Sequence, residues 1–164
     1  MRVAVISDTH DHTERIARAV RIAAAEGCEW MLHLGDVVAP FAVTPLGEFP
    51  GQIQAVFGNN DGETHGLRRA FARIGGEIDP PPYRMELAGK RLAMLHDPWL
   101  LEELAASQRF DYILYGHLHE YRQERDRCTL SLNPGDGGGW VGTPQFCLLD
   151  LETGRVTPVS LRDA

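Results

Sequence analysis

The first ten residues, MRVAVISDTH (Met1–His10), place an apolar run directly before an aspartate and a histidine. The apolar run Val3–Ile6 predicts a buried strand over residues 2–7, and Asp8 and His10 follow it directly. Residues two apart in extended chain face the same side, so these two side chains can turn toward one point. The stretch therefore predicts a strand whose carboxyl end carries polar, chemically capable groups.

The same arrangement recurs further along the chain. Apolar runs at 30–34, 53–57, 91–95 and 112–115 predict strands, and polar side chains follow each of them directly. In order, the residues after these five strands are Asp8 and His10; Asp36; Asn59 and Asp61; His96; and His117 and His119. Carboxyl ends of parallel strands share one edge of a sheet, where ligands bind in open α/β folds. We therefore expect the five loops to converge on one site.

Helical stretches separate the early strands. Periodic apolar positions predict helices over 14–26, 67–74 and 99–107, which gives a βαβ rhythm. A tight turn at 88–90 joins predicted strands at 83–87 and 91–95. The chain ends in further predicted strands at 129–132, 145–151 and 156–161. We expect an α/β protein with two packed sheets and, as a working assumption, a single domain over 1–164, since no repeat or composition shift requires a boundary.

The side chains that follow the strands suit a divalent cation. Carboxylates and an amide oxygen are hard ligands and imidazoles are borderline, while no thiolate is near. Cys28, Cys128 and Cys147 lie far apart and lack C-x-x-C spacing, which argues against a disulfide framework or a thiolate zinc site. Glycines directly before or within the loops, Gly35, Gly58 and Gly116, would permit sharp turns that aim the next residue inward.

The overall charge limits the choice of partner. The formal net charge is -7 and the basic residues are scattered, so no continuous positive face is expected for a nucleic acid. The apolar run at the amino terminus is too short for a signal peptide or a membrane span. We expect a cytoplasmic protein with a small-molecule substrate and no membrane partner; a homo-oligomer stays possible.

The ordered motifs resemble those of the calcineurin-like metallophosphoesterases, in particular the small bacterial and archaeal phosphodiesterases related to the Vps29 subunit of the eukaryotic retromer. The resemblance covers nearly the whole chain. It rests on the following motifs: S-D-T-H at 7–10, H-L-G-D at 33–36, G-N-N-D at 58–61, the lone His96, G-H-L-H at 116–119 and N-P-G at 133–135.

The resemblance implies a two-sheet α/β/β/α sandwich that holds two divalent metal ions, of Mn, Fe, Co, Ni or Zn. By that resemblance Asp8, His10 and His119 hold the first ion, and Asn59, His96 and His117 hold the second. Asp36 bridges both. The implied reaction is hydrolysis of a phosphodiester by a hydroxide shared between the ions, with Asn59, Asp61 and His117 as candidate catalytic residues.

Two departures from the family pattern bear on this mechanism. Many relatives have a histidine after the asparagine, where this chain has Asn60, so the usual proton donor to the leaving group is not identifiable. Asp61 could take part directly in catalysis, or it could orient the metal ligands through hydrogen bonds. The residue after His96 is commonly glycine in close relatives, whereas here it is Asp97.

Several alternatives stay open at this point. His12, His33 and His65 are interpreted as structural or surface histidines, with His33 in the core, although His12 and His65 could replace the missing acid. The glycine-rich stretch 135–139 before Trp140 is interpreted as a flexible loop rather than a cap over a substrate pocket. The competing function is a Vps29-like protein-binding scaffold with residual metal binding, and a nuclease is a third, less favoured possibility.

Overall fold

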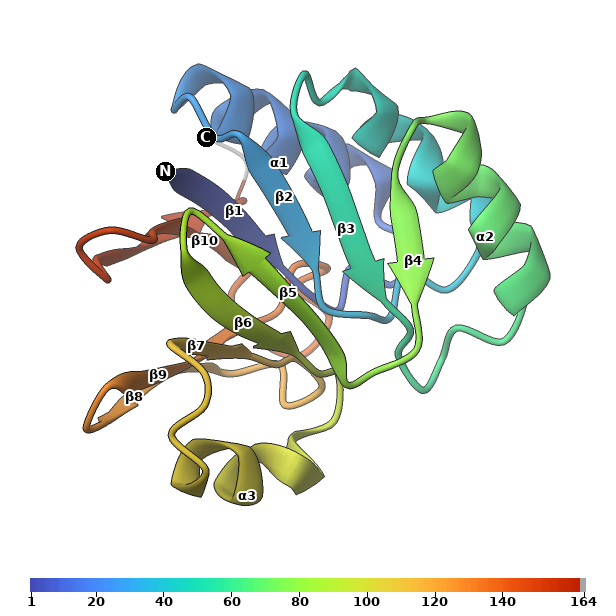
Figure 1. The fold of residues 1–164 in the computed structure, drawn as a ribbon. Helices are drawn as coiled ribbons and strands as arrows, with labels where there is room; N and C mark the ends of the chain where they lie inside the picture. The colour runs from blue at the N-terminus through green and yellow to red at the C-terminus, as the bar shows by residue number, and fades with distance from the viewer. Residues whose placement is uncertain (163–164) are drawn as a thin grey trace.

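The structure, a computed structural model, describes residues 1–162, so the last two residues of the expected 1–164 domain lie outside it. Within these residues the strands form two sheets (Figure 1). The six-stranded sheet has the order β11-β10-β1-β2-β3-β4, in which β1 to β4 are parallel and β10 and β11 alternate in direction. Its strands are β1 (Arg2–Ile6), β2 (Trp30–His33), β3 (Gln52–Val56), β4 (Glu77–Asp79), β10 (Gln145–Asp150) and β11 (Val156–Ser160).

The second, five-stranded sheet has the order β5-β6-β7-β9-β8. Its central strands β6, β7 and β9 are parallel, and an antiparallel strand closes each edge. The strands are β5 (Tyr83–Leu87), β6 (Lys90–Met94), β7 (Tyr112–Leu114), β8 (Tyr121–Asp126) and β9 (Thr129–Pro134).

Helices cover the outer face of each sheet. Figure 1 shows α1 and α2 against the six-stranded sheet and α3 below the five-stranded sheet. The helical segments are α1 (Thr13–Ala25), η1 (Pro40–Glu48), α2 (Thr64–Arg73), η2 (Pro98–Leu100) and α3 (Leu101–Ala106). The expected α/β/β/α sandwich is confirmed.

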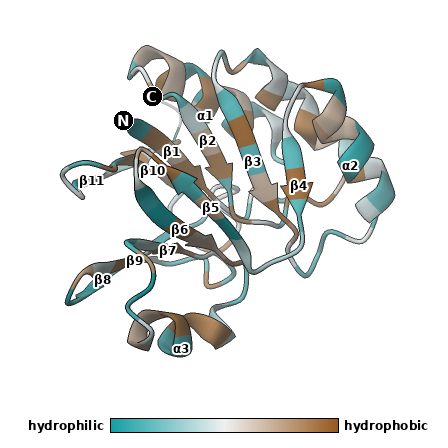
Figure 2. Ribbon diagram, viewed as in Figure 1, coloured by the Kyte–Doolittle hydropathy of each residue, from teal (hydrophilic) through white to brown (hydrophobic). Residues whose placement is uncertain are grey.

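Alternation along β1 shows why two apolar layers form. Ala4 and Ile6 pack with buried residues of α1, η1 and α2. Val3 and Val5 point the other way and pack with residues of the second sheet such as Leu114. Successive side chains of a strand face opposite sides, so a strand buried on both faces reads as a continuous apolar run. In Figure 2, β3 of the same sheet carries both brown and teal bands, because its apolar residues are interrupted by glutamines.

Most of the expected elements are present, with small shifts at their ends. The helix expected over 14–26 is α1, and its predicted apolar face is buried at Ile16, Val20 and Ala23. The helix expected over 67–74 begins three residues earlier, at Thr64. Three elements were not predicted: η1, which contains two prolines, the three-residue strand β4, and β8, whose residues are all exposed.

This topology brings the polar loops to one place. β1, β2 and β3 are parallel neighbours, so their carboxyl ends lie at one edge, as the arrowheads of β2 and β3 show in Figure 1. β6 and β7 are likewise parallel neighbours in the second sheet. Across residues 1–162, no helix has the length and apolar character that crossing a membrane requires.

Candidate metal centre

Backbone hydrogen bonds connect the loops that follow the five strands. The N–H of Asp8 donates to the carbonyl of Gly35 over 3.0 Å, and the N–H of Gly116 donates to the carbonyl of His96 over 3.0 Å. The N–H of His117 donates to Oδ2 of Asp8 over 3.0 Å, which joins the second sheet to the first. The structure thus brings all the predicted loops together between the two sheets.

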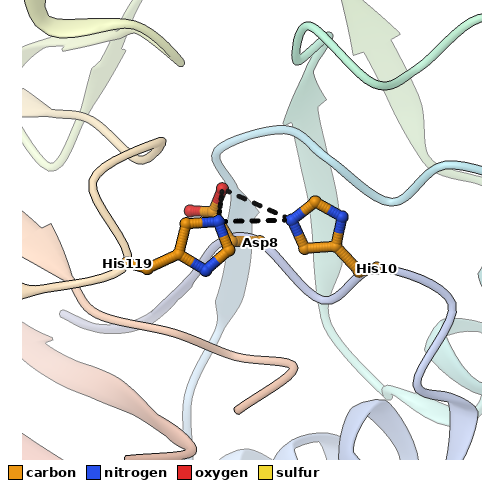
Figure 3. Close-up of side chains that lie close together, drawn as sticks. All are labelled: Asp8, His10 and His119. Atoms are coloured by element: carbon orange, nitrogen blue, oxygen red, sulfur yellow. Dashed lines mark hydrogen bonds and ion pairs between the residues drawn. The ribbon is translucent and has the colours of Figure 1, made fainter. Parts of the chain in front are cut away.

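Asp8, His10 and His119 form a first group of facing side chains (Figure 3). The Nε2 atoms of the two histidines are 3.4 Å apart. Oδ1 of Asp8 lies 3.6 Å from Nε2 of His119 and 4.0 Å from Nε2 of His10. One ligand atom from each residue falls within 4.8 Å of the others, a spacing that a single cation can fill.

Asn59, His96 and His117 form a second group. Oδ1 of Asn59 lies 2.8 Å from Nε2 of His96 and 2.9 Å from Nδ1 of His117. The other ring nitrogen of His96, Nδ1, is 2.8 Å from the carbonyl oxygen of Leu34, to which it can only donate. Nε2 of His96 therefore faces the Asn59 oxygen and the Asp36 carboxylate, and it needs either a proton or a cation there. Burial opposes the charged form, but Asp36 outweighs it and raises the pKa of His96, so without a metal ion the ring can carry that proton.

Asp36 lies between the two groups. Its Oδ2 is 3.5 Å from Nε2 of His10 in the first group and 3.5 Å from Nε2 of His96 in the second. Asn60 holds this carboxylate, because its backbone N–H donates to Oδ1 over 2.8 Å and its side-chain amide donates to Oδ2 over 2.7 Å. Burial would raise the pKa of Asp36, but the hydrogen bonds from His96 and Asn60 outweigh it and lower the pKa. An ionised carboxylate therefore lies between the two groups of side chains.

Within residues 1–162, two buried atoms of the first group make no hydrogen bond: Oδ1 of Asp8 and Nδ1 of His119. Asp8 is fully buried, and its Oδ1 accepts no hydrogen bond from the described residues. Burial raises the pKa of Asp8, and the neighbouring Ser7, His96 and His119 offset this only in part. A buried carboxylate oxygen without a donor is costly, and a divalent cation would remove that cost. The donor set of carboxylate, amide and imidazole atoms fits first-row divalent metals.

The backbone at these positions is strained. Asp8, His10, Asp36, His117 and His119 all have positive φ angles, between 41° and 69°. L-residues other than glycine rarely adopt this left-handed region, and such outliers cluster at functional sites, where the surrounding fold holds them. The fold thus maintains an unfavourable backbone at five of the predicted ligands.

Two of the three noted glycines are required by close packing rather than by φ. A Cβ at Gly58 would overlap the backbone and carboxylate of Asp36, and a Cβ at Gly116 would overlap the hydroxyl of Ser7. Of these three glycines, Gly35 is the one with a positive φ, of 98°. At Gly58 and Gly116 the sharp-turn explanation is therefore replaced by the close approach of two loops.

Asp61 lies directly behind this centre and is almost fully buried. Its carboxylate accepts from the backbone N–H of Asp36 (3.0 Å), Val38 (2.7 Å) and Gly58 (2.7 Å). Burial raises the pKa of Asp61, and the backbone donors offset this only in part. Both oxygens are thus engaged in fixing the loops that carry Asp36 and Asn59.

The remaining histidines lie outside the two groups. His33 is fully buried, with Nε2 3.1 Å from the Thr9 hydroxyl and Nδ1 accepting from the N–H of Gly35, so the core interpretation agrees with its position. His65 is exposed on α2. His12 precedes α1, and its ring centre lies 6.2 Å from that of Trp140.

Sequence reasoning missed one residue beside the centre, Asp136. It is fully buried, and its Oδ2 lies 3.3 Å from Nδ1 of His119. Burial opposes ionisation, but the N–H groups of Gly142 and Val141, together with His119, lower its pKa. Asp136 follows β9, so the same pattern of a polar residue after a strand could have found it. The glycines beside it predict only a loop, which does not point to a buried carboxylate.

The family follows from a comparison with known proteins. Residues 1–154 match the model of the calcineurin-like phosphoesterase superfamily domain. The chain belongs to this superfamily. It is therefore a phosphoesterase, and enzymes of this superfamily use divalent metals, which agrees with the donor groups described above.

Individual relatives support this assignment. The phosphoesterase is 33% identical to phosphodiesterase MJ0936 of Methanocaldococcus jannaschii over 156 residues, covering 93% of this chain and 94% of the relative. A solved structure described as a novel archaeal phosphodiesterase superposes with a TM-score of 0.92 at 31% identity, covering 98% and 99% of the two chains. Vps29 of Chaetomium thermophilum has a TM-score of 0.71 at 18% identity over 97% and 93%, a likeness of fold alone.

Proposed function

We propose that this phosphoesterase hydrolyses small phosphodiesters with two divalent metal ions. The observation that carries the proposal is the position of Asp36, whose Oδ2 is 3.5 Å from a histidine nitrogen of each ligand group. A carboxylate placed between two sets of donors is suited to bridging two ions. The similarity to a relative named as a phosphodiesterase supports the choice of substrate.

In this proposal Asp8, His10 and His119 hold one ion, Asn59, His96 and His117 hold the other, and Asp36 holds both. Bound there, the ions would supply Lewis acidity to the phosphoryl oxygens and lower the pKa of an attacking water. Ions of Mn, Fe, Co, Ni or Zn all suit these donors. Two divalent ions exceed the charge of Asp8 and Asp36, which makes the centre locally cationic in an acidic protein.

The other residues of the site divide into two roles. The side chain of His117 is 39% exposed at the mouth of the centre, so His117 and its neighbour Asn59 are placed to meet the phosphate. Asn60 orients Asp36 through two hydrogen bonds. For Asp61, three backbone donors favour a positioning role over direct proton transfer.

A diester fits this site better than a monoester. A monoester dianion carries a second negative charge, and none of the residues placed in the site above is lysine or arginine. The single charge of a diester needs no such partner. A nuclease function is not favoured, because the net charge of -7 does not suit a polyanion.

A protein-binding scaffold is also not favoured. A scaffold has no use for a buried carboxylate oxygen without a hydrogen-bond donor, such as Oδ1 of Asp8. It would equally have no reason to keep strained backbone at five donor residues. The intact donor set supports an enzyme.

The test is hydrolysis of bis(p-nitrophenyl) phosphate by protein stripped with a chelator and reloaded with Mn²⁺. We expect activity only after reloading, and a loss of at least about 100-fold in kcat/KM for both Asp36→Ala and His117→Ala, because each change removes a donor from the centre. p-Nitrophenyl phosphate, run in parallel, should be the poorer substrate.

The matched control is His65→Ala, which removes an exposed histidine on α2 and should keep full activity. Circular dichroism verifies that each variant is folded. Activity that survives both Asp36→Ala and His117→Ala would refute the proposal.

A further inference from the structure

An open cleft adjoins the first ligand group. Its volume is about 500 Å³, and two of its walls are the candidate ligands His10 and His119. Trp140 and Val141, which are 67% and 79% exposed, line the same cleft. A molecule whose phosphate is held at the centre therefore has an apolar surface immediately beside it.

Trp140 is held in place rather than carried on a loose loop. Asp136 accepts hydrogen bonds from the N–H groups of Gly139 (2.6 Å), Val141 (2.7 Å) and Gly142 (2.9 Å), on both sides of the tryptophan. The preceding segment is tied to β1, because the N–H of Gly137 donates to Ser7 and that of Gly138 donates to Asp8. The flexible loop expected from the glycines is thus a tethered turn that presents an indole ring.

The same aspartate contacts the first ligand group, through Nδ1 of His119 at 3.3 Å. The backbone on both sides of Trp140 and the ring of His119 therefore meet at one carboxylate, which places the aromatic surface beside the first ligand group. An exposed aromatic ring on a held backbone beside a phosphate site suits a planar substituent, since stacking gains affinity and little ordering of the backbone is required.

We propose that this cleft binds a planar aromatic substituent of the phosphodiester substrate, stacked on Trp140. The proposal rests on the proposed function and specifies its substrate class. The planar group could be an aryl ester or the base of a nucleoside ester, which share the same stacking chemistry. Val38 adds a further apolar wall, while Asp11 and Asn60 supply polar edges.

A second exposed tryptophan provides an internal comparison. Trp99 is 77% exposed and lines a smaller pocket of about 280 Å³ next to His96, on the side of the second ligand group. It sits on the three-residue η2 rather than on a loop anchored by Asp136. Trp99→Ala therefore removes the same type of side chain at a similar exposure as Trp140→Ala, but beside the second ligand group instead of the first.

Hydrolysis of a diester leaves a phosphate monoester as one product, so monoesters probe the product state of the same centre. The test is calorimetric binding to Mn²⁺-loaded protein of four probes: inorganic phosphate, methyl phosphate, phenyl phosphate and AMP. We expect phenyl phosphate, AMP or both to bind at least about 10-fold more tightly than methyl phosphate. Preference for phenyl phosphate alone identifies an aryl ester, and preference for AMP alone identifies a nucleoside ester. Trp140→Ala should abolish the preference, Trp140→Phe should keep part of it, and Trp99→Ala should keep all of it.

Equal binding of methyl and aromatic probes by the wild type would overturn the stacking proposal while leaving the phosphoester site intact. So would a preference that persists in Trp140→Ala. If no probe binds, inorganic phosphate included, the proposed phosphoester site fails and the stacking proposal fails with it. Because binding is measured without turnover, these outcomes stay separate from a loss of catalysis.

Discussion

The buried His33 shows how one residue near the centre is fixed in a single protonation state. Its Nδ1 accepts from the N–H of Gly35 over 3.2 Å, and its Nε2 faces the hydroxyl of Thr9. Burial lowers its pKa to about 3 from an ordinary value of 6.5. A proton on Nδ1 would face another N–H, so the folded protein keeps this ring neutral.

We predict that His33 makes the protein less stable as the pH falls from 6.5 toward 3. In this range the unfolded chain binds a proton at His33 that the folded chain does not, so stability rises with pH, by up to about 1.4 kcal/mol per pH unit for one proton. Urea unfolding in the presence of a chelator at pH 6.5, 5.8 and 5.0 measures the slope. His33→Gln should flatten it.

The control for this prediction is His65→Gln, which changes an exposed histidine and should keep the wild-type slope. The same slope in His33→Gln as in the wild type would show that His33 is not the group that titrates. The difference between the wild-type slope and the His33→Gln slope isolates the contribution of His33, because the other histidines contribute equally to both.

Asp136 is a residue whose neighbours come from distant parts of the chain. A single buried carboxylate contacts His119 on one side and accepts from three backbone N–H groups of the following turn on the other. Its position after β9 was visible in the sequence. That its side chain reaches a histidine far earlier in the chain was not.

Among the elements, the hairpin of β5 and β6 agrees closely with the two strands and tight turn predicted from the sequence. Leu87 pairs with Lys90, so Ala88 and Gly89 form a two-residue turn, and their φ angles are 49° and 72°. Positive φ at both positions is typical of a type I′ turn, which favours asparagine followed by glycine. Alanine at the first position is unfavourable there, since its Cβ crowds the backbone.

We predict that Ala88→Asn stabilises the protein by about 0.5–1 kcal/mol, because asparagine tolerates the left-handed region better than alanine. Equilibrium unfolding in urea measures the change. Gly89→Ala in the same turn should destabilise by a similar amount. An Ala88→Asn variant no more stable than the wild type would contradict the type I′ assignment of this turn.

The elements that were missed lack the pattern on which prediction depends. β8 pairs with β9 along its whole length, yet all of its residues are exposed. An edge strand with two exposed faces shows no alternation of apolar and polar residues, so only its backbone pairing defines it. β4 is three residues long and contains Glu77 and Asp79, too little for any periodicity.

For the whole molecule, the candidate metal centre lies at the junction between the two sheets. Asp8, His10, Asp36 and Asn59 come from the six-stranded sheet, whereas His96, His117 and His119 come from the five-stranded sheet. Each proposed ion would therefore draw ligands from both sheets. Binding there should oppose separation of the layers.

We predict that Mn²⁺ at about 100 times its dissociation constant stabilises the folded protein by about 2.7 kcal/mol. For a chain of this size the corresponding rise in Tm is roughly 5–10 °C. Thermal unfolding with and without chelator measures it. His119→Ala should lose most of the rise in Tm, while His65→Ala should keep it. An unchanged Tm on adding Mn²⁺ to the wild type would contradict the proposal that a metal ion binds between the two sheets.

The sequence by itself determined the class of fold and the identity of the candidate ligands. Both depend on local patterns: apolar runs define the strands, and a polar residue directly after a strand lies at its carboxyl end. That information is contained within about ten residues around Asp8, Asp36 or His117.

Only the tertiary structure decided how those residues meet. His119 lies 3.6 Å from Asp8, although they are far apart in the chain, because the two sheets pack face to face. Strand pairing within the first sheet places β10 between β1 and β11. The connection from β9 to β10 therefore crosses from one sheet to the other and carries Asp136 and the Trp140 turn beside His119. Contacts of this kind depend on the arrangement of whole layers, which no local pattern of residues encodes.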